Sequence, residues 1–274
     1  MKKGIALLLA LIMMMSFAAC GEKPEVPTDA PTEISTETPT TAEEPIELTV
    51  FAAASLTETL TQIAEQYKTV APNVNLVFNF DSSGTLKTQI EEGATCDLFL
   101  SAAQKQMNAL ADEDLLNADS RIDLLENKVV LAVPDGNPAG VTQFEDAATD
   151  KVKLIALGNS DVPVGQYSEE IYTYLGVWEQ MQSKITFGSN VKEVTTWVCE
   201  GAADCGVVYA TDAYSAGLSI VATAPAEWMK NRVVYPAAVL KQSAHADAAQ
   251  AFLNYLSGGE CDTIFESVGF AMCK

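Results

Sequence analysis

From residue 46 onward the chain alternates between short apolar segments of strand type and amphipathic segments of helix type, and this alternation restricts the fold more than any other feature. Branched and aromatic residues in short runs predict strands, while apolar residues three and four positions apart predict helices. Strands that alternate with helices form parallel sheets with helices on both faces. The pattern therefore predicts an α/β fold with mostly parallel sheets.

The periodicity also sets approximate bounds for these elements. We predict strands at residues 46–52, 74–80, 97–102, 128–133, 152–157, 184–187 and 205–209. We predict helices at residues 55–70, 85–92, 104–112, 165–175 and 191–200.

The chain that follows residue 45 is long enough for two lobes of ordinary size. Strand-like segments that follow polar stretches, near residues 126–129 and 234–238, predict the two crossings between lobes. The first lobe is then expected to contain residues 46–127 and 238–274, and the second residues 128–237. A ligand would lie between the lobes, because open α/β sheets place their crevices at the carboxyl ends of the strands.

Several predicted helices begin with residues that favour helix N-termini. Ser55 and Glu58 have the spacing of a capping box, as do Asn190 and Glu193. Two further starts follow the segments FDSSG and DVPVG. The free amides of a helix N-terminus form a cradle for an anion, although each start taken alone is more often a cap that binds nothing. Four such starts after four strands predict one shared anion site.

The segments FAAASLTETL, FDSSGTLKTQIEEGATCDLFLSA, DVPVGQY, SNVKEV and GVVYATDA, in this order, resemble the molybdate-binding proteins of molybdate ABC importers. The similarity extends through nearly all of residues 46–274. It implies a two-lobed, type II periplasmic-binding-protein fold. It also implies that a tetrahedral oxyanion, molybdate or tungstate, is captured outside the cytoplasmic membrane and delivered to the permease and ATPase subunits of an ABC importer.

The resemblance implies a set of ligand-binding residues that act through hydroxyls and main-chain amides. These are Ser55, Ser83, Val164, Val191 and Tyr209. Two positions depart from the family pattern, since Val164 stands where alanine is common and Gly84 where a third serine occurs. Val164 keeps its amide available, and its side chain is expected to narrow the pocket.

A site made of donors agrees with this ligand. Each hydrogen bond to a buried charged group contributes about 1.5–3 kcal/mol, and each helix N-terminus adds about half a positive charge. No basic side chain is required, so Lys87 and Lys192 are expected to face solvent. Asp81 is expected to be a solvent-facing turn residue; the alternative is that it lies in the site, where it would be the nearest acceptor for the proton of hydrogen phosphate. No cofactor and no direct ligands to a metal cation are expected.

The first twenty residues have the pattern of an export signal. Two lysines precede an apolar segment at residues 5–17, which is shorter than the roughly 20 residues that span a bilayer. Cys20 follows two alanines in a sequence that resembles a bacterial lipobox, with Phe17 where leucine is usual. We predict that residues 1–20 are a lipoprotein signal peptide and that Cys20 is lipidated.

Residues 21–45 are rich in Pro, Thr and Glu and poor in large apolar side chains, which predicts a disordered acidic tether behind the lipid anchor. The protein is expected to be a monomer held at the cell membrane. Its formal net charge of −21 argues against nucleic acid as a partner.

Five cysteines follow Cys20, and an odd number in an exported protein leaves at least one thiol unpaired. Proximity in sequence predicts the disulfides Cys199–Cys205 and Cys261–Cys273, and Cys96 is predicted to be a buried thiol. In a host that lives without oxidants, all five would be reduced. Zinc is disfavoured because no Cys-x-x-Cys occurs and the chain has one histidine.

Two other classes of function fit the residues less well. Ser83 before Gly84 could be a nucleophile, but His245 lies in an Ala-rich helical stretch and no Gly-x-Ser-x-Gly, Walker or dinucleotide motif occurs, so no enzyme is expected. A sugar or amino-acid binder would need a stacking aromatic ring or a clamping arginine. The candidates for stacking, interpreted as packing residues, are Trp178, Trp197 and Trp228. A solute-binding lipoprotein for another anion, such as sulfate, is the alternative.

Overall fold

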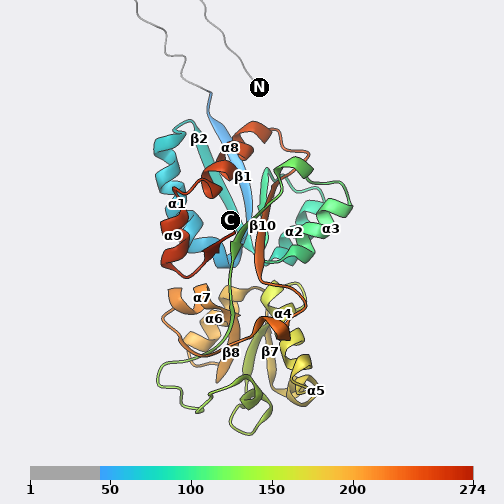
Figure 1. Cartoon of the computed structure of the whole chain (residues 1–274), viewed down its shortest axis with the longest axis vertical. Coiled ribbons are helices and arrows are strands. Elements are labelled where there is room, and N and C mark those ends of the chain that lie inside the picture. The colour runs from blue at the N-terminus through green and yellow to red at the C-terminus, as the bar shows by residue number, and fades with distance from the viewer. Residues whose placement is uncertain (1–43, 274) are drawn as a thin grey trace, which may run out of the picture. The chain divides into compact units, whose positions relative to one another are not determined.

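The computed structural model describes residues 44–273, which form one compact unit with two β-sheets flanked by helices (Figure 1). This confirms the predicted α/β fold class. The predicted signal peptide and the lipidation site at Cys20 lie outside the described residues, as does all of the tether before residue 44.

The first sheet has the strand order β11-β4-β10-β3-β1-β2. Its strands are β1 (Ile46–Ala53), β2 (Val74–Asp81), β3 (Leu98–Leu100), β4 (Ile122–Glu126), β10 (Val234–Val239) and β11 (Ala271–Met272). Strand β1 pairs in parallel with β2 and β3, whereas β10 pairs antiparallel with β3 and β4. The helical segments of this lobe are η1 (Ala54–Leu56), α1 (Thr57–Val70), α2 (Ser83–Glu91), α3 (Gln104–Asp112), η2 (Ala118–Ser120), α8 (Ala246–Ser257) and α9 (Asp262–Ser267).

The second sheet has the strand order β7-β6-β8-β5-β9. Its strands are β5 (Val129–Val133), β6 (Ile155–Gly158), β7 (Ile185–Gly188), β8 (Cys205–Tyr209) and β9 (Ser219–Thr223). Strand β6 pairs in parallel with β7 and β8, and β5 pairs antiparallel with β8 and β9. The helical segments are η3 (Phe144–Ala148), α4 (Pro163–Tyr174), α5 (Trp178–Met181), η4 (Gln182–Lys184), α6 (Val191–Cys199), α7 (Ala210–Ser215) and η5 (Ala226–Trp228).

The chain crosses between the sheets twice, and the strand that enters each sheet runs against its neighbours. The first crossing joins β4 to β5 through Asn127 and Lys128, and the second joins β9 to β10. Strands β5 and β10 start at the side where β4, β6 and β8 end, so each must run in the opposite direction. The carboxyl ends of the remaining parallel strands therefore face the region between the lobes.

The first crossing lies at Asn127 and Lys128, and the chain re-enters the first sheet at Val234, so residues 234–237 lie in that sheet and not in the second lobe to which the sequence pattern assigned them. Val234 already pairs with Glu126 of β4, and Tyr235 pairs with Leu125. The register shifts between Tyr235 and Pro236, because proline has no amide hydrogen for the ladder.

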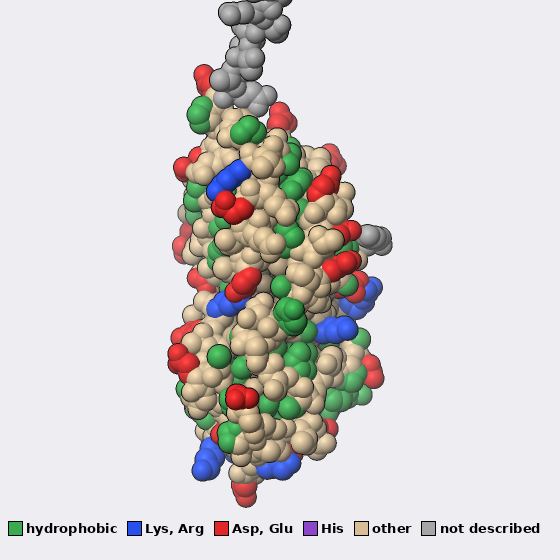
Figure 2. Space-filling model, turned by 90° about the vertical axis from the view of Figure 1, so that its left-hand side faces the viewer, with side chains coloured by type: hydrophobic (Ala, Val, Ile, Leu, Met, Phe, Trp, Pro, Cys, Tyr) green, Lys and Arg blue, Asp and Glu red, His purple; other side chains and the backbone are tan. Residues whose placement is uncertain are grey.

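Burial follows from this layered arrangement. All five residues of β5 are buried, because the strand lies inside the sheet with helices on its faces. The three tryptophans pack partly buried against the core, in agreement with their interpretation as packing residues. Acidic side chains are spread over the face drawn in Figure 2 and do not gather into one patch. Among residues 44–273 no helix combines the length and the apolarity needed to cross a bilayer.

The predicted disulfides are not formed, because the five described cysteines are all free thiols. Cys205 is buried at the start of β8, whereas Cys199 is exposed at the end of α6, so the five residues between them separate a buried from an exposed side chain. Cys261 is buried with its Sγ 3.5 Å from the Tyr255 carbonyl, and Cys273 is half-buried beside Glu126. Proximity in sequence was therefore a poor guide to pairing.

Cys96 is a buried thiol as predicted, with its Sγ 3.4 Å from the Leu98 carbonyl. Burial raises the pKa of Cys96 to about 12 and the pKa of Cys205 to about 12. The thiolate is the reactive species, so these two thiols are almost entirely unreactive at neutral pH in the folded protein.

This difference predicts the order of thiol labelling. Exposed Cys199 should react with iodoacetamide in the native protein, whereas Cys96 and Cys205 should react only after denaturation. Mass mapping of peptides labelled before and after unfolding measures both sets. Labelling of native Cys96 at the rate of Cys199 would contradict the described burial.

Candidate functional site

Loops from both lobes meet at one small cavity at the carboxyl ends of the parallel strands. The residues that line it are Ala53, Ala54, Ser55, Asp81, Ser82, Ser83, Ala102, Val162, Pro163, Val191 and Tyr209. The cavity volume is about 10 Å³, which is about the space for one water molecule. Four of the five residues implied by the family resemblance therefore lie together, and they come from η1, α2, α6 and β8.

Ser55 lies in the short helix η1, and the predicted capping box with Glu58 is wrong. Helix α1 begins only at Thr57 with Leu56 as its N-cap, because η1 separates the helix from the end of β1. The Ser55 hydroxyl is released from capping and lies 2.9 Å from the hydroxyl of Tyr235. Ser55 is therefore a buried hydroxyl at the cavity, held by a tyrosine of the same lobe.

Ser83 is the first residue of α2 and is buried. The preceding Ser82 caps this helix by accepting a hydrogen bond from the Thr85 amide at 3.1 Å. The Ser83 oxygen accepts a hydrogen bond from the Ala102 amide at 2.9 Å, which leaves the hydroxyl proton of Ser83 free to donate.

Val191 and Val164 contribute main chain at the starts of two helices of the second lobe. Val191 is the first residue of α6, and Asn190 caps that helix by accepting from the Glu193 amide at 3.1 Å. The predicted capping box is incomplete, because the Glu193 carboxylate accepts from the Ser189 amide in place of the Asn190 amide. Val164 is the second residue of α4, after Pro163. Amides in a first turn have no acceptor within their own helix, so both valines present free donors.

The Val164 side chain does not narrow the cavity. It is fully buried in the core, whereas Val162 and Pro163 line the cavity in its place. The departure from alanine at this position therefore affects packing behind the loop more than the space between the lobes.

Tyr209 ends β8 and reaches across to the first lobe. Its hydroxyl donates to the Ala102 carbonyl at 3.3 Å. Burial raises the pKa of Tyr209 well above its usual value, so the hydroxyl is neutral and carries one proton to donate. Ala102 is thus hydrogen-bonded to a hydroxyl from each lobe. Its amide donates to Ser83 of the first lobe, and its carbonyl accepts from Tyr209 of the second.

Asp81 is not the solvent-facing turn residue that we expected. It lines the cavity, and its Oδ1 accepts from the Ser82 amide at 2.7 Å and from Asn190 Nδ2 at 3.3 Å. One carboxylate oxygen therefore holds the start of α2 and contacts the cap of α6 in the other lobe.

Lys192 also does not face solvent alone, because it forms ion pairs in both lobes. Its Nζ lies 2.7 Å from Glu58 of α1 and 3.2 Å from Asp212 of α7. Burial raises the pKa of Asp212 to about 6 against the attraction of Lys192. Lys87, by contrast, pairs with Glu91 on its own helix. The Lys192 pairs hold the lobes together without adding a cation to the cavity lining.

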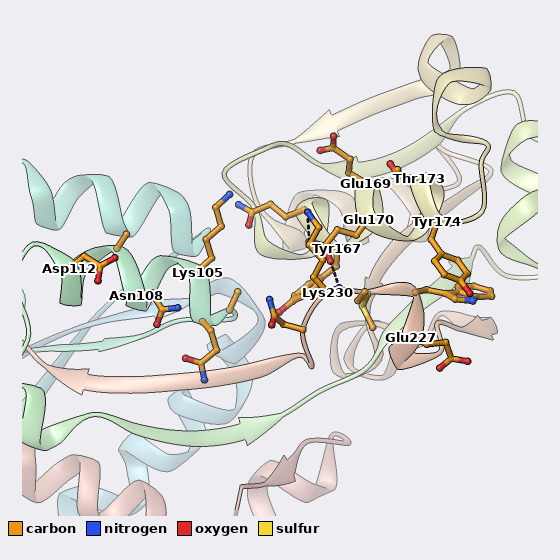
Figure 3. A pocket seen from close by; sticks show the side chains of 17 residues that line it. Lys105, Asn108, Asp112, Tyr167, Glu169, Glu170, Thr173, Tyr174, Glu227 and Lys230 are labelled. Atoms are coloured by element: carbon orange, nitrogen blue, oxygen red, sulfur yellow. Dashed lines mark hydrogen bonds and ion pairs between the residues drawn. The ribbon is translucent and has the colours of Figure 1, made fainter.

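A second, larger pocket lies between α3 and α4 and has a volume of about 1110 Å³ (Figure 3). Its lining includes the carboxylates Asp112, Glu169, Glu170 and Glu227. Its carboxylates outnumber the two lysines of the same lining, Lys105 and Lys230, which disfavours an anion. The small cavity has one carboxylate, Asp81, beside its hydroxyls and helix starts. Residues 44–273 contain no group of three or more His, Cys, Asp or Glu side chains arranged to hold a metal ion.

Two lobes joined by two crossings, with donors from both lobes converging between them, define a solute-binding protein. The chain belongs to the family of bacterial extracellular solute-binding proteins, whose model matches residues 48–271.

Relatives of known class match most of the chain. The lipoprotein YvgL of Bacillus subtilis, assigned to ABC transport as a substrate-binding protein, is 37% identical over 86% of this chain and 90% of its own. The molybdate-binding protein ModA of Haemophilus influenzae is 36% identical over 82% of this chain and 89% of its own. The solved structure of the periplasmic molybdate-binding protein of Azotobacter vinelandii superposes with a TM-score of 0.74 at 25% identity and covers 83% of this chain and 100% of its own.

Gly84 lies at a close backbone contact between the two lobes. Its amide donates to the Asp161 carbonyl of the other lobe at 3.0 Å, and a Cβ added to Gly84 would lie 2.2 Å from that oxygen. This contact requires glycine because the backbones approach too closely for any side chain. Serine, which the family pattern allows here, would meet the same overlap.

Gly84→Ala should therefore weaken closure and ligand affinity without unfolding either lobe. We expect a loss of about 1–3 kcal/mol in binding free energy, since the added methyl must separate the lobes. Calorimetric titration with molybdate gives the affinity, and the thermal unfolding midpoint monitors the fold. Thr88→Ala on the exposed side of the same helix is the matched control. An unchanged affinity in Gly84→Ala would contradict this role.

Proposed function

We propose that this protein captures molybdate or tungstate outside the cytoplasmic membrane and delivers it to the permease and ATPase subunits of an ABC importer. The observation that carries the proposal is the convergence of hydroxyls and first-turn amides from both lobes on one cavity without a basic side chain in its lining. Such donors suit a fully ionised tetrahedral dianion. The relatives that bind molybdate share the fold over most of the chain.

The proposed ligand set comprises three hydroxyls and two main-chain amides. The hydroxyls belong to Ser55, Ser83 and Tyr209, and the amides to Val164 and Val191. A dianion has no counter-ion in this lining, so each oxygen must be stabilised by hydrogen bonds and by the helix N-termini.

Binding requires a local rearrangement of the cavity. A tetrahedral oxyanion is larger than the single water molecule that about 10 Å³ admits. The Tyr209 hydroxyl must also transfer its hydrogen bond from the Ala102 carbonyl to the anion. The ligand then replaces the Tyr209–Ala102 hydrogen bond with several charge-assisted hydrogen bonds from both lobes. Because only the closed state can form all of these bonds, ligand binding favours that state.

The same site gives no support to catalysis. The Ser83 oxygen accepts from a backbone amide and has no histidine beside it, and His245 precedes α8 on the first lobe. We therefore propose a binding protein without enzymatic activity and without a cofactor, acting as a monomer.

The ligand set predicts the effect of removing single hydroxyls. Ser55→Ala, Ser83→Ala and Tyr209→Phe should each weaken molybdate binding by about 1.5–3 kcal/mol, because each deletes one bond to a buried charge. Calorimetric titration measures these losses. Val191→Ala, which keeps its amide, and Tyr172→Phe, in the core of the second lobe, are controls that should retain affinity. Equal affinities in all variants would show that the site is misplaced.

The same titration with tungstate, sulfate and phosphate tests the class of anion. Tungstate should bind like molybdate, whereas hydrogen phosphate carries a proton whose burial without an acceptor costs about 1–3 kcal/mol. Asp81 is the one carboxylate in the cavity lining, so Asp81→Asn distinguishes two outcomes. Phosphate binding that disappears in this variant would mean that Asp81 accepts the phosphate proton. Sulfate binding tighter than molybdate would favour the alternative, a sulfate-binding lipoprotein.

We further propose that the protein is anchored to the membrane through lipidated Cys20 and held on an acidic tether. Support comes from the lipobox-like sequence at residues 17–21 and from similarity to the lipoprotein YvgL. Cys20→Ser should release the protein from the membrane fraction without changing molybdate affinity, because the binding domain begins beyond residue 43. Cys199→Ser is the matched control and should stay with the membrane. Retention of the Cys20→Ser protein in the membrane fraction would refute lipid anchoring at this residue.

A further inference from the structure

A chain of hydrogen bonds leads from the first crossing between the lobes to Ser55. Asn127 lies in that crossing, and its Nδ2 donates to Thr211 Oγ1 at 2.9 Å and to Tyr235 Oη at 3.2 Å. The Tyr235 hydroxyl lies 2.9 Å from Ser55 Oγ. Thr211 belongs to the second lobe and Tyr235 to the first, so the chain connects both lobes with a proposed ligand-binding hydroxyl.

The direction of the first bond in this chain is fixed by the backbone. The amide of Lys128 can only donate, and it donates to Asn127 Oδ1 at 2.8 Å. The other end of the Asn127 side chain is therefore its NH₂ group, which can only donate to the two hydroxyls that it contacts. Tyr235 must accept at this position.

The remaining directions follow from proton counting. Tyr235 is fully buried, and burial raises its pKa well above the usual value, so it is neutral and has a single proton. Its oxygen already accepts from Asn127. Either hydroxyl of the Tyr235–Ser55 pair could be the donor, and we assign the Tyr235 proton to Ser55 Oγ because the Tyr235 oxygen is already occupied as an acceptor. Ser55 then accepts from Tyr235 and has its own proton left for a ligand.

We propose that Asn127 and Tyr235 are positioning residues that make Ser55 an obligate donor, and thereby select a fully ionised oxyanion over a protonated one. This inference rests on the proposed function, because it assigns a selectivity to the same site. Neither residue lines the cavity, so both act through Ser55 and not on the ligand.

The most direct test is to reverse the direction of the hydrogen bonds between Asn127 and Ser55. In Asn127→Asp a carboxylate oxygen would replace the NH₂ group and accept the Tyr235 proton. Tyr235 would then accept from Ser55, and Ser55 would face the ligand as an acceptor. Molybdate would lose a donor, whereas hydrogen phosphate would gain an acceptor for its proton. The added negative charge weakens the binding of both dianions alike, so the ratio of their affinities isolates the reversal.

The experiment measures molybdate and phosphate affinities by calorimetric competition at mildly alkaline pH, where phosphate is mainly the singly protonated dianion. In Asn127→Asp the preference for molybdate over phosphate should fall by about tenfold or more, which corresponds to one hydrogen bond lost and one gained. A preference unchanged from the wild type would overturn the proposal.

Tyr235→Phe provides a second and independent measurement. It should weaken molybdate binding about threefold to tenfold in the wild-type background and cause no further loss in a Ser55→Ala background, because its effect passes through that hydroxyl. A purely structural role would give the same loss in both backgrounds and would overturn the proposal.

Tyr172→Phe is the matched control for this substitution. Tyr172 is fully buried in α4, and its hydroxyl has no hydrogen-bond partner within residues 44–273. The change should leave both anion affinities at wild-type values, and thermal unfolding of each variant monitors the fold. If the wild-type protein binds neither molybdate nor tungstate, the proposed function itself is refuted. If the wild-type protein binds molybdate but the variants keep its preference over phosphate, only the inference about Asn127 and Tyr235 is refuted.

Discussion

The structure depends on a single constraint, which is that free amides at helix starts must find acceptors where several strands end together. Parallel strands bring their carboxyl ends to the same edge, and the helices that follow begin there. Helices α2, α4 and α6 therefore point their N-termini into the region between the lobes. Their partial positive charges meet in a protein whose net charge is −21, so local dipoles and not overall charge make this region suitable for an anion.

Closure of the two lobes depends on the same region. The approach of Gly84 to Asp161, the contact of Asn190 with Asp81, and the pairing of Lys192 with Glu58 all cross between the lobes beside the cavity. Each contact is modest alone, and the Lys192–Glu58 pair is partly screened by solvent. Among these three contacts, the approach at Gly84 is the one that leaves no room for a side chain.

The chain of hydrogen bonds from Asn127 to Ser55 explains why an asparagine suits the first crossing between the lobes. The side-chain oxygen of Asn127 accepts from the Lys128 amide, and its NH₂ group donates to two hydroxyls, so both ends of this half-buried side chain are hydrogen-bonded. The orientation of Ser55 is thus set by the element about which the lobes are joined. Anion recognition and lobe geometry share these hydrogen bonds.

Strand and helix periods are local properties, so most of the elements could be predicted from the sequence, whereas β4, β9 and α7 were missed. Helix α3 and strand β8 have the predicted bounds, and the starts of α2, α4 and α6 place the proposed donors after strands. Contacts between side chains that are far apart in the sequence could be identified only from the tertiary structure. The partnership of Ser55 with Tyr235, 180 residues apart, the contact of Lys192 with Glu58 and the separation of Cys199 from Cys205 leave no local pattern. Such contacts depend on how two sheets are packed and crossed, and periodicity within one segment carries no information about its partner in another.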